Sequence, residues 1–182
     1  MANLQANLDD LTPDDVLRAA VRNLSNRGPL YKAWANRVEA VIVTAFKNQA
    51  EPYTNTPWPD LTPTYDAYKK GRRRDIARRK RQAKKTGTPY RDPRGAPKAG
   101  GTLTLQYTGA LFDSTFARVE GNGVVAGSNL RVGDYSLGAI HQFGAPRAGI
   151  RPRRWLPVTD TGEPMPQLVA DLVQLTETYL SS

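Results

Sequence analysis

A run of positive charge in the middle of the chain limits what the rest can fold into. Between Lys69 and Lys98 there are 14 basic and 2 acidic residues, a net charge of +12, whereas the whole chain of 182 residues carries only +9. The remainder therefore carries −3. Only Ile76 and Ala77 offer apolar surface in the most basic part of this run. Because unpaired charges are rarely buried, we expect an exposed arm, at best partly helical.

The length of the chain fits a single domain over residues 1–182, with residues 66–101 as a basic, flexible arm or insertion. Glycine and proline are frequent after Thr86, as in a flexible connector. The absence of cysteine excludes disulfides and is typical of proteins assembled in a reducing cytoplasm. The start of the chain lacks the pattern of a signal peptide, and no apolar stretch approaches the length of a membrane helix. We expect a soluble protein with no membrane partner.

Two helices are predicted near the N-terminus. Thr12 is a suitable N-cap and is followed by Pro13 and two aspartates, and the apolar residues after them recur at helical spacing until about Gly28. A second apolar stripe runs from Pro29 to about Gln49. The tight joint between them predicts a helical hairpin. Four prolines between Glu51 and Pro63 then predict a loop pinned by the indole of Trp58.

From Leu103 onward the pattern changes to short strands and turns. We expect a short helix or turn at 110–114, strands at 116–119 and 124–127, and a hairpin turn at 120–123 in which Asn122-Gly123 accepts positive φ angles. Residues 137–143 are predicted to be a helical turn or strand end, and 167–180 an amphipathic helix. The predicted fold class is α+β: an N-terminal helical pair and a C-terminal helix packed on a small, mainly antiparallel sheet, with the basic arm extending from it.

Catalysis has little support in the sequence. His141 is the only histidine, and no cysteine or second histidine accompanies it, so a zinc site lacks its ligands. We interpret His141 as a packed or interfacial side chain that donates to a backbone carbonyl. Glycines such as Gly109 and Gly121 match neither a phosphate-binding loop nor a nucleophile elbow, so we interpret them as turn residues. We expect no enzymatic activity, no catalytic residue, no metal and no cofactor.

Three short words in the C-terminal half resemble those of a known family. They are LQYTGALFDS at 105–114, YSLGAIHQFG at 135–144 and IRPRRWLP at 150–157. They are similar to the L-Q-x-T-G-x-L-x-x-S, Y-A-x-x-H-Q-F-G and P-x-R-x-(F/W)-L words of the virion morphogenesis, or tail-completion, family of contractile-tailed phages. A Pro-Trp-Pro-Asp-Leu word at 57–61, after the helix ending near Phe46, extends the resemblance to Leu17–Pro157 in ordered pieces. The departures are Ser136 for alanine, Trp155 for phenylalanine and Arg154 for proline.

The resemblance implies structural roles for the residues of these words. It places Phe143 in the core and Gly144 at a turn. We expect Trp155 and Leu156 to anchor their segment in the core, although an exposed contact residue is the alternative for Trp155. The neighbouring arginines would point outward and clamp carboxylates of another subunit. The structural motif residues are Trp58, Gly109, Leu111, His141, Phe143, Gly144, Arg153, Trp155 and Leu156.

The function that the resemblance implies is architectural. Such a protein is a tail terminator or tail-completion protein of the virion neck, assembled in the host cytoplasm, whose six-subunit ring caps the tail tube and joins tail to head. The implied partners are its own copies, the tail tube and sheath proteins, and the head–tail connector or neck proteins. A head-side neck protein, either a stopper or an adaptor, is the first alternative. A basic nucleic-acid-binding protein is the second.

Three interpretations of the basic arm stay open. It could contact an acidic surface of a neighbouring protein, neutralise phosphates of genomic DNA without sequence preference, or form a solvated charged surface. Aromatic residues lie only at its margins, so stacking on single-stranded bases is unsupported. The arm residues are Lys69, Lys70, Arg72, Arg73, Arg74, Arg78, Arg79, Lys80, Arg81, Lys84 and Lys85.

Overall fold

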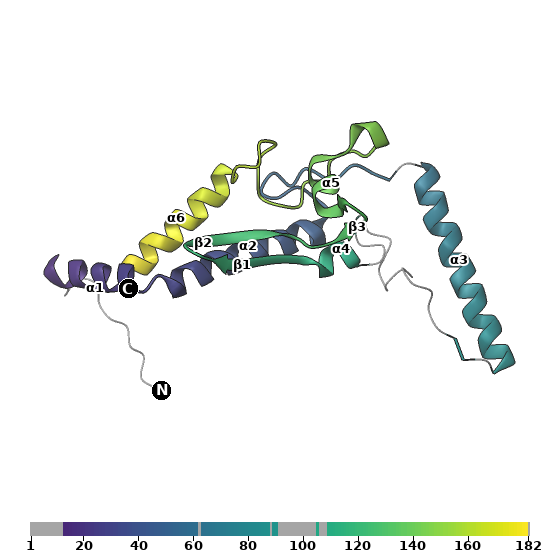
Figure 1. Ribbon diagram of the computed structural model, residues 1–182, viewed down its shortest axis with the longest axis horizontal. Helices are drawn as coiled ribbons and strands as arrows, with labels where there is room; N and C mark the ends of the chain where they lie inside the picture. Colours follow the sequence, from purple (N-terminus) through teal and green to yellow (C-terminus); the bar gives the residue numbers. More distant parts are fainter. Residues whose placement is uncertain (1–12, 62, 88, 91–104, 106–108, 182) are drawn as a thin grey trace.

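The computed structural model describes residues 13–61, 63–87, 89–90, 105 and 109–181. Its elements, labelled in Figure 1, are α1 (Pro13–Ser25), α2 (Gly28–Asn48), α3 (Pro63–Thr86), α4 (Ala110–Asp113), β1 (Thr115–Glu120), β2 (Gly123–Ser128), β3 (Arg131–Val132), β4 (Tyr135–Ser136), α5 (Leu137–Phe143), the 3-10 helix η2 (Pro146–Ala148) and α6 (Pro166–Leu180). The α+β prediction is confirmed. The strands form two antiparallel pairs, β1–β2 and β3–β4.

The two predicted N-terminal helices are present with nearly the expected bounds, but the predicted hairpin is not formed, because α1 packs against α6 and not back along α2. Pro29 lies in the first turn of α2, where its fixed φ suits a helix and its missing N–H costs nothing. At the other end Gln49 takes a left-handed conformation, with φ 55°, and its N–H bonds the carbonyl of Ala45. The predicted Thr12 cap of α1 lies outside the described residues, as do the Leu103 strand start and residues 91–101 of the connector.

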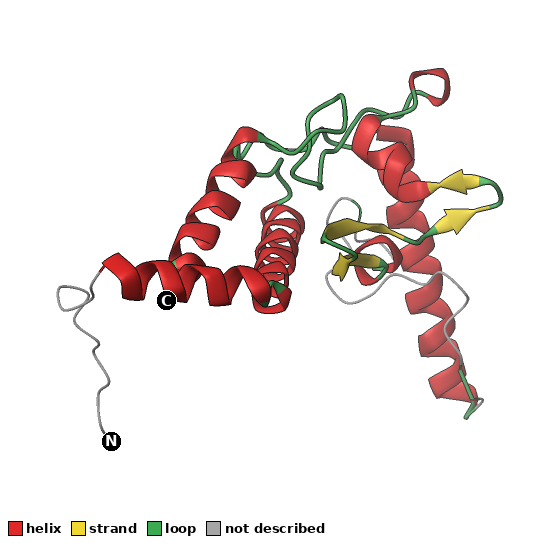
Figure 2. Cartoon of the chain, turned by 60° about the vertical axis from the view of Figure 1, so that its left-hand side comes forward, coloured by secondary structure: helices red, strands yellow, loops and turns green. Residues whose placement is uncertain are grey.

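The core lies on one face of α2. Both strands of the β1–β2 hairpin and the helix α6 pack against α2, and α1 packs against α6. Figure 2 shows the strands on the side of the molecule away from α1 and α6. Phe46 is at the centre, with its ring 5.4 Å from that of Trp58, 5.2 Å from Phe112 and 5.8 Å from Trp155. Three segments distant in sequence therefore meet on one α2 side chain.

The β1–β2 turn lies at 120–123 as predicted, but a different residue takes the positive φ. Glu120 pairs with Gly123, so Gly121 and Asn122 form the two-residue loop, and Gly121 carries the positive φ of 58°. A glycine at the first loop position is the pattern of type II′ hairpins, whereas the predicted Asn-Gly pair is that of type I′. The hairpin was predicted correctly. The residue that supplies the positive φ was not.

The basic arm is a helix over most of its length. The prediction that it is at best partly helical is wrong for residues 63–86, which form α3. Arginine, lysine, glutamine and alanine all favour helices intrinsically, and Asp66 pairs with Lys70 one turn later at 2.6 Å. The prediction weighed the missing apolar face more heavily than this propensity. Among the described residues, no helix is both long and apolar enough to cross a bilayer.

Candidate functional site

His141, the only histidine of the chain, has a partly buried imidazole. Its Nδ1 is buried and has no hydrogen-bond partner among the described residues, so the predicted bond to a carbonyl is not seen at that nitrogen. Burial lowers the pKa of the imidazole, and the nearby charge of Arg153 lowers it further. No group of three potential metal-ligating side chains occurs in the described part of the chain. The imidazole is therefore a neutral, packed group at pH 7.

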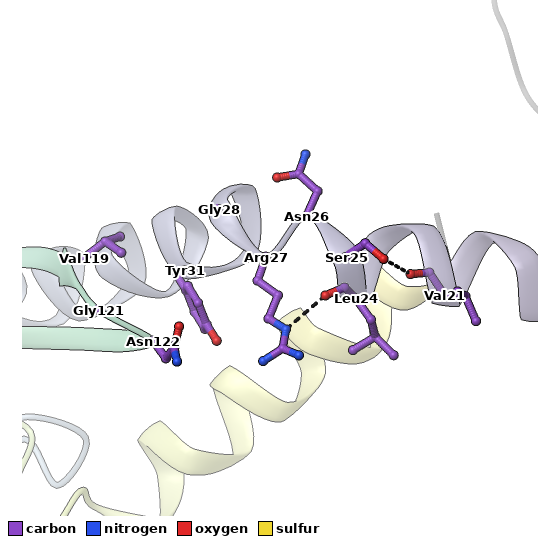
Figure 3. Close-up of a pocket in the computed structure, with 10 residues that line it drawn as sticks. All are labelled: Val21, Leu24, Ser25, Asn26, Arg27, Gly28, Tyr31, Val119, Gly121 and Asn122. Carbon is purple, nitrogen blue, oxygen red and sulfur yellow. Dashed lines mark hydrogen bonds between the residues drawn. The ribbon is translucent and has the colours of Figure 1, made fainter.

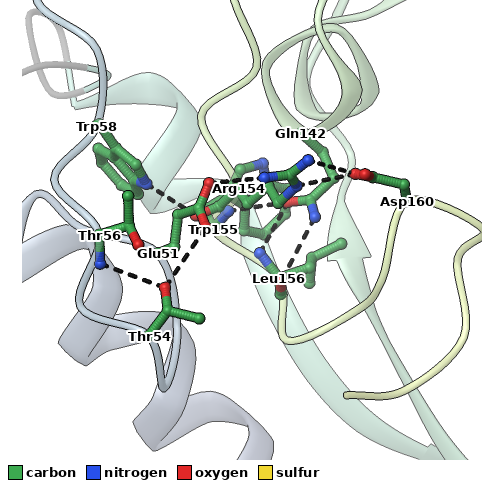
Figure 4. Close-up of polar contacts among 9 residues, drawn as sticks. All are labelled: Glu51, Thr54, Thr56, Trp58, Gln142, Arg154, Trp155, Leu156 and Asp160. Atoms are coloured by element: carbon green, nitrogen blue, oxygen red, sulfur yellow. Dashed lines mark hydrogen bonds and ion pairs between the residues drawn. The ribbon is translucent and has the colours of Figure 1, made fainter.

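Gln142 holds the segment around Trp155 in place. Its side chain is buried, and Oε1 accepts hydrogen bonds from the backbone N–H groups of Trp155 at 2.8 Å and Leu156 at 2.9 Å (Figure 4). The indole of Trp155 is buried and donates to the carbonyl of Gly138 at 3.2 Å. Leu156 is partly buried against the core. The prediction that Trp155 and Leu156 anchor this segment is confirmed, but Gln142 was not singled out.

The helix α5 presents its small and polar face to the core. Gly138 and Gln142, four residues apart, are its buried residues, whereas Phe143 is 47% exposed. A Cβ on Gly138 would lie 2.9 Å from Cβ of Ser128 and 3.2 Å from the Trp155 ring. Because Gly138 has no side chain, this face of α5 can pack closely against Ser128 and Trp155. The expectation that Phe143 is a core residue is therefore wrong.

The predicted turn and anchor residues of the other words lie as expected. Gly144 has φ 79°, and a Cβ there would lie only 3.0 Å from the carbonyl oxygen of Ile150 and 3.1 Å from Pro152, so a side chain would be strained. Gly109 has φ 74° and precedes α4, and Leu111 is buried in the core. Trp58 is also buried, and its Nε1 donates to the carbonyl of Arg154 at 2.8 Å. The loop at 51–61 is thereby tied to the C-terminal half.

The three arginines around Trp155 take different positions. Arg153 is only 7% exposed and donates to the carbonyls of Pro59 at 3.1 Å and Asp60 at 3.2 Å, so the prediction that it points outward is wrong. Prolines in that loop remove N–H donors, and its carbonyls are satisfied by the guanidinium instead. Arg154 contacts carboxylates, but within its own chain: it pairs with Glu51 and Asp160 (Figure 4). Arg151 is exposed.

Most of the positive charge lies on α3. The helix has eleven basic and two acidic residues, a net charge of +9 that equals the charge of the whole chain. Figure 1 shows α3 standing apart from α2 and the hairpin. One face carries the buried side chains of Lys69 and Ile76. Burial lowers the pKa of Lys69, as do the charges of Arg73 and Arg153.

The other predicted arm residues lie around the remaining surface of α3. Lys70 pairs with Asp66, Arg72 donates to the hydroxyl of Tyr68 at 3.0 Å, and Lys80 lies 5.5 Å from the ring centre of Tyr90. The remaining predicted cations are exposed, apart from the half-buried Arg73. The exposed ones are Arg74, Arg78, Arg79, Arg81, Lys84 and Lys85.

A first apolar surface is on α1. Leu17, Val21 and Leu24 recur at spacings of four and three, so they share one face, and they are 63%, 57% and 48% exposed. The helix is held to α6 by a bond from Asn23 to the carbonyl of Tyr179 at 2.7 Å. The tyrosine hydroxyl in turn donates to the carbonyl of Asn26. A strongly amphipathic helix thus turns apolar side chains toward solvent.

This surface continues into an open groove of about 780 Å³. Figure 3 shows its wall running from α1 through the α1–α2 joint to the tip of the β1–β2 hairpin. Val21 and Leu24 supply one side, and Tyr31 and Val119 supply the other. Arg27 lies between them and donates through Nε to the carbonyl of Leu24 at 3.0 Å, leaving the rest of its guanidinium exposed. The groove therefore has a mixed lining: four apolar side chains, the cation Arg27, and a polar remainder of Ser25, Asn26, Asn122 and two glycines.

A second set of exposed apolar side chains lies on β3, β4 and α5. Val132 and Tyr135 pair across the short hairpin and are 60% and 71% exposed, and the exposed Phe143 is on the adjoining helix. Asp134 lies in the turn between the strands and is exposed. In Figure 1, α1 is at one end of the body and β3 with α5 is toward the other. The two apolar surfaces are therefore separate.

Comparison of the chain with protein-family models, with curated proteins and with solved structures finds no match. These comparisons therefore add no support to the resemblance between its short words and the tail-completion family.

Proposed function

We propose that this protein is a structural subunit that assembles head to tail with its own copies. The ring so formed would be a tail-completion or tail-terminator ring, which caps a phage tail tube and joins it to the head. The observation that carries the proposal is the pair of separate apolar surfaces, one on α1 and its groove and one on β3, β4 and α5. The resemblance of the three short words supplies the phage context.

Two unlike surfaces on one body favour a heterologous contact. If the surface at one end binds the surface at the other end of the next copy, successive contacts close into a ring or continue as a filament. Stable interfaces bury roughly 800 Å² per partner. The groove at one end and three large exposed side chains at the other would supply part of such an area.

Charge also fits the proposed contact. Asp134 lies between the two apolar side chains of the β3–β4 hairpin, and Arg27 lies at the rim of the groove, with Arg22 in the last turn of α1. If the hairpin of one copy enters the groove of the next, its carboxylate meets these cations. Complementary charges of this kind fix the register of an interface more than its affinity. The occupant we propose for the groove is therefore the β3–β4 hairpin of a second copy.

A complementation experiment tests the head-to-tail contact. Val21→Glu removes one surface and Tyr135→Glu removes the other, and both side chains are exposed, so folding is preserved. Wild-type protein should form closed oligomers in light scattering, and each variant alone should be monomeric. An equimolar mixture should form dimers and nothing larger, because only one intact pair of surfaces remains.

The control is Val43→Glu, at an exposed apolar position of α2 outside both surfaces, which should assemble like the wild type. A symmetric contact between two α1 faces predicts instead that Tyr135→Glu stays dimeric alone. That result would contradict the proposal. Finding the protein in isolated tails supports the tail-side role, and finding it only in heads would favour a stopper or adaptor.

A further inference from the structure

Four cations form a stripe on the outward face of α3. Arg74, Arg78, Arg81 and Lys85 are separated by four, three and four residues. At 3.6 residues per turn these side chains fall within an arc of about 60°, and at 1.5 Å per residue they span about 16 Å. Together with Ala77 and Gln82 they line a shallow open depression on the helix surface. The buried Lys69 and Ile76 are on the opposite face.

The fold makes little use of these charges. Arg74, Arg81 and Lys85 have no ion-pair partner among the described residues, and Arg78 has only an exposed contact with Asp75 at 3.6 Å. Exposed pairs of this kind contribute little to stability. Four cations aligned on one face repel each other, so the stripe is poorly explained by the stability of α3 itself.

The chemistry of the stripe favours phosphates over an acidic protein surface. Protein interfaces have cores depleted of charge and enriched in aromatic side chains, whereas the only uncharged residues here are Ala77 and Gln82. Protein–nucleic acid interfaces are more polar and far more positive. Three of the four cations are arginines, whose planar fork matches phosphate oxygens. The stripe has no aromatic side chain on which an unpaired base could stack, which favours a duplex over a single strand.

We infer that the stripe of Arg74, Arg78, Arg81 and Lys85 binds the phosphate backbone of duplex nucleic acid without reading its sequence. Duplex DNA carries one negative charge per roughly 1.7 Å of its axis, so a 16 Å stripe faces enough phosphates for all four side chains. Binding of this kind releases counterions and weakens steeply with salt. The inference is independent of ring formation, because all four residues belong to one helix of one copy.

The test is a binding titration of a labelled 30-base-pair duplex by fluorescence anisotropy at several salt concentrations. It uses the full chain carrying Val21→Glu and Tyr135→Glu, so that the avidity of an oligomer does not enter. Four phosphate contacts predict that affinity falls about 150-fold between 50 and 200 mM salt. The double variant Arg74→Gln with Arg81→Gln removes two of the four contacts, so its affinity should fall only about 12-fold over the same salt range. Two duplexes of unrelated sequence should bind alike.

The matched control is Arg79→Gln with Lys84→Gln, which removes the same charge from the same helix but outside the stripe. It should retain the roughly 150-fold salt dependence. Circular dichroism checks that each variant keeps its helix content. Equal losses in both variants, or no duplex binding at low salt, would overturn the inference. So would tighter, stripe-dependent binding of labelled polyglutamate, which would indicate an acidic protein partner instead.

Discussion

Gln142 occupies a position where a conventional core would have an apolar side chain. Because its Oε1 satisfies the N–H groups of both Trp155 and Leu156, replacing it leaves two donors without an acceptor. Each unsatisfied buried group costs about 1–3 kcal/mol. We therefore expect Gln142→Leu to lower the free energy of unfolding by about 2–4 kcal/mol in urea titrations.

Gln167→Leu is the control for that change, because Gln167 is an exposed glutamine in the first turn of α6. It should alter the free energy of unfolding by less than about 0.5 kcal/mol. If both variants unfold at the same urea concentration, Gln142 is not the residue that holds the Trp155 segment.

His141 should make stability depend on pH near neutrality. Its pKa is lowered in the folded state by burial and by the charge of Arg153, so the unfolded chain binds a proton more readily than the folded one. The stability it contributes is complete above the unfolded pKa of about 6.5 and is lost as pH falls toward the folded pKa. We therefore expect the thermal midpoint of unfolding to decrease as the pH is lowered from about 7.5 to about 5.5.

In His141→Gln that pH dependence should be flat over the same range, since this is the only histidine side chain. A midpoint that falls equally in both proteins would show that another group titrates. Neither residue effect was visible in the sequence: it marked His141 only by its rarity and by its place in the YSLGAIHQFG stretch, and it gave no sign that Gln142 points inward.

At the scale of elements, α5 depends on a glycine. Ala at 138 would place its Cβ 2.9 Å from Cβ of Ser128, and neither atom is at the end of a flexible side chain. Gly138→Ala should therefore lower the free energy of unfolding by about 1–3 kcal/mol. Gly71, inside α3, has open space within 4 Å of the position that a Cβ would take. Gly71→Ala should therefore raise the free energy of unfolding by about 0.5–1 kcal/mol, or raise the helix content of the protein. The two substitutions should therefore change the free energy of unfolding in opposite directions. Urea unfolding and circular dichroism measure these changes.

Asp171 joins α6, α2 and the loop after α2. Its Oδ2 accepts from Arg37 Nη2 at 2.7 Å and from the hydroxyl of Tyr53 at 2.5 Å, and these bonds lower the pKa of the carboxyl. Burial and the same carboxylate raise the pKa of Tyr53 to about 12, so it stays a donor. Both partners are partly exposed. We therefore expect Asp171→Asn to cost only about 1 kcal/mol at pH 7.

The contribution of Asp171 is present above its unfolded pKa of about 3.9 and is lost as pH falls through the lower folded value. The wild type and Asp171→Asn should therefore converge in stability as pH falls through the lowered folded pKa of this carboxyl. A constant difference from pH 7 to pH 2.5 would show that the charge of this carboxylate is not what joins the three elements.

Helices with a clear apolar period were predictable, and elements held by polar contacts were not. α2 has both a Pro-containing start and a continuous stripe, and its bounds agree within a residue or so. In α3 the prediction followed the missing apolar face, whereas intrinsic propensity and the Asp66–Lys70 pair favour a helix. Phe143 was misplaced because the sequence does not reveal that Gly138 lets α5 approach the Trp155 ring.

At the scale of the whole molecule, two kinds of surface remain that the fold itself does not use. The apolar ends of the body, on α1 and on β3–β4 with α5, are proposed to join copies to each other. The stripe on α3 is proposed to hold duplex phosphates. Their separation along the chain means that assembly and nucleic-acid binding can be removed independently.

The molar mass of the purified wild-type protein, with electron microscopy of its particles, tests the central claim of head-to-tail assembly most directly. The account predicts closed rings, and six copies of the 20.1 kDa chain give a mass of about 120 kDa. A mass of one chain at every concentration, with no particles in the micrographs, would contradict it.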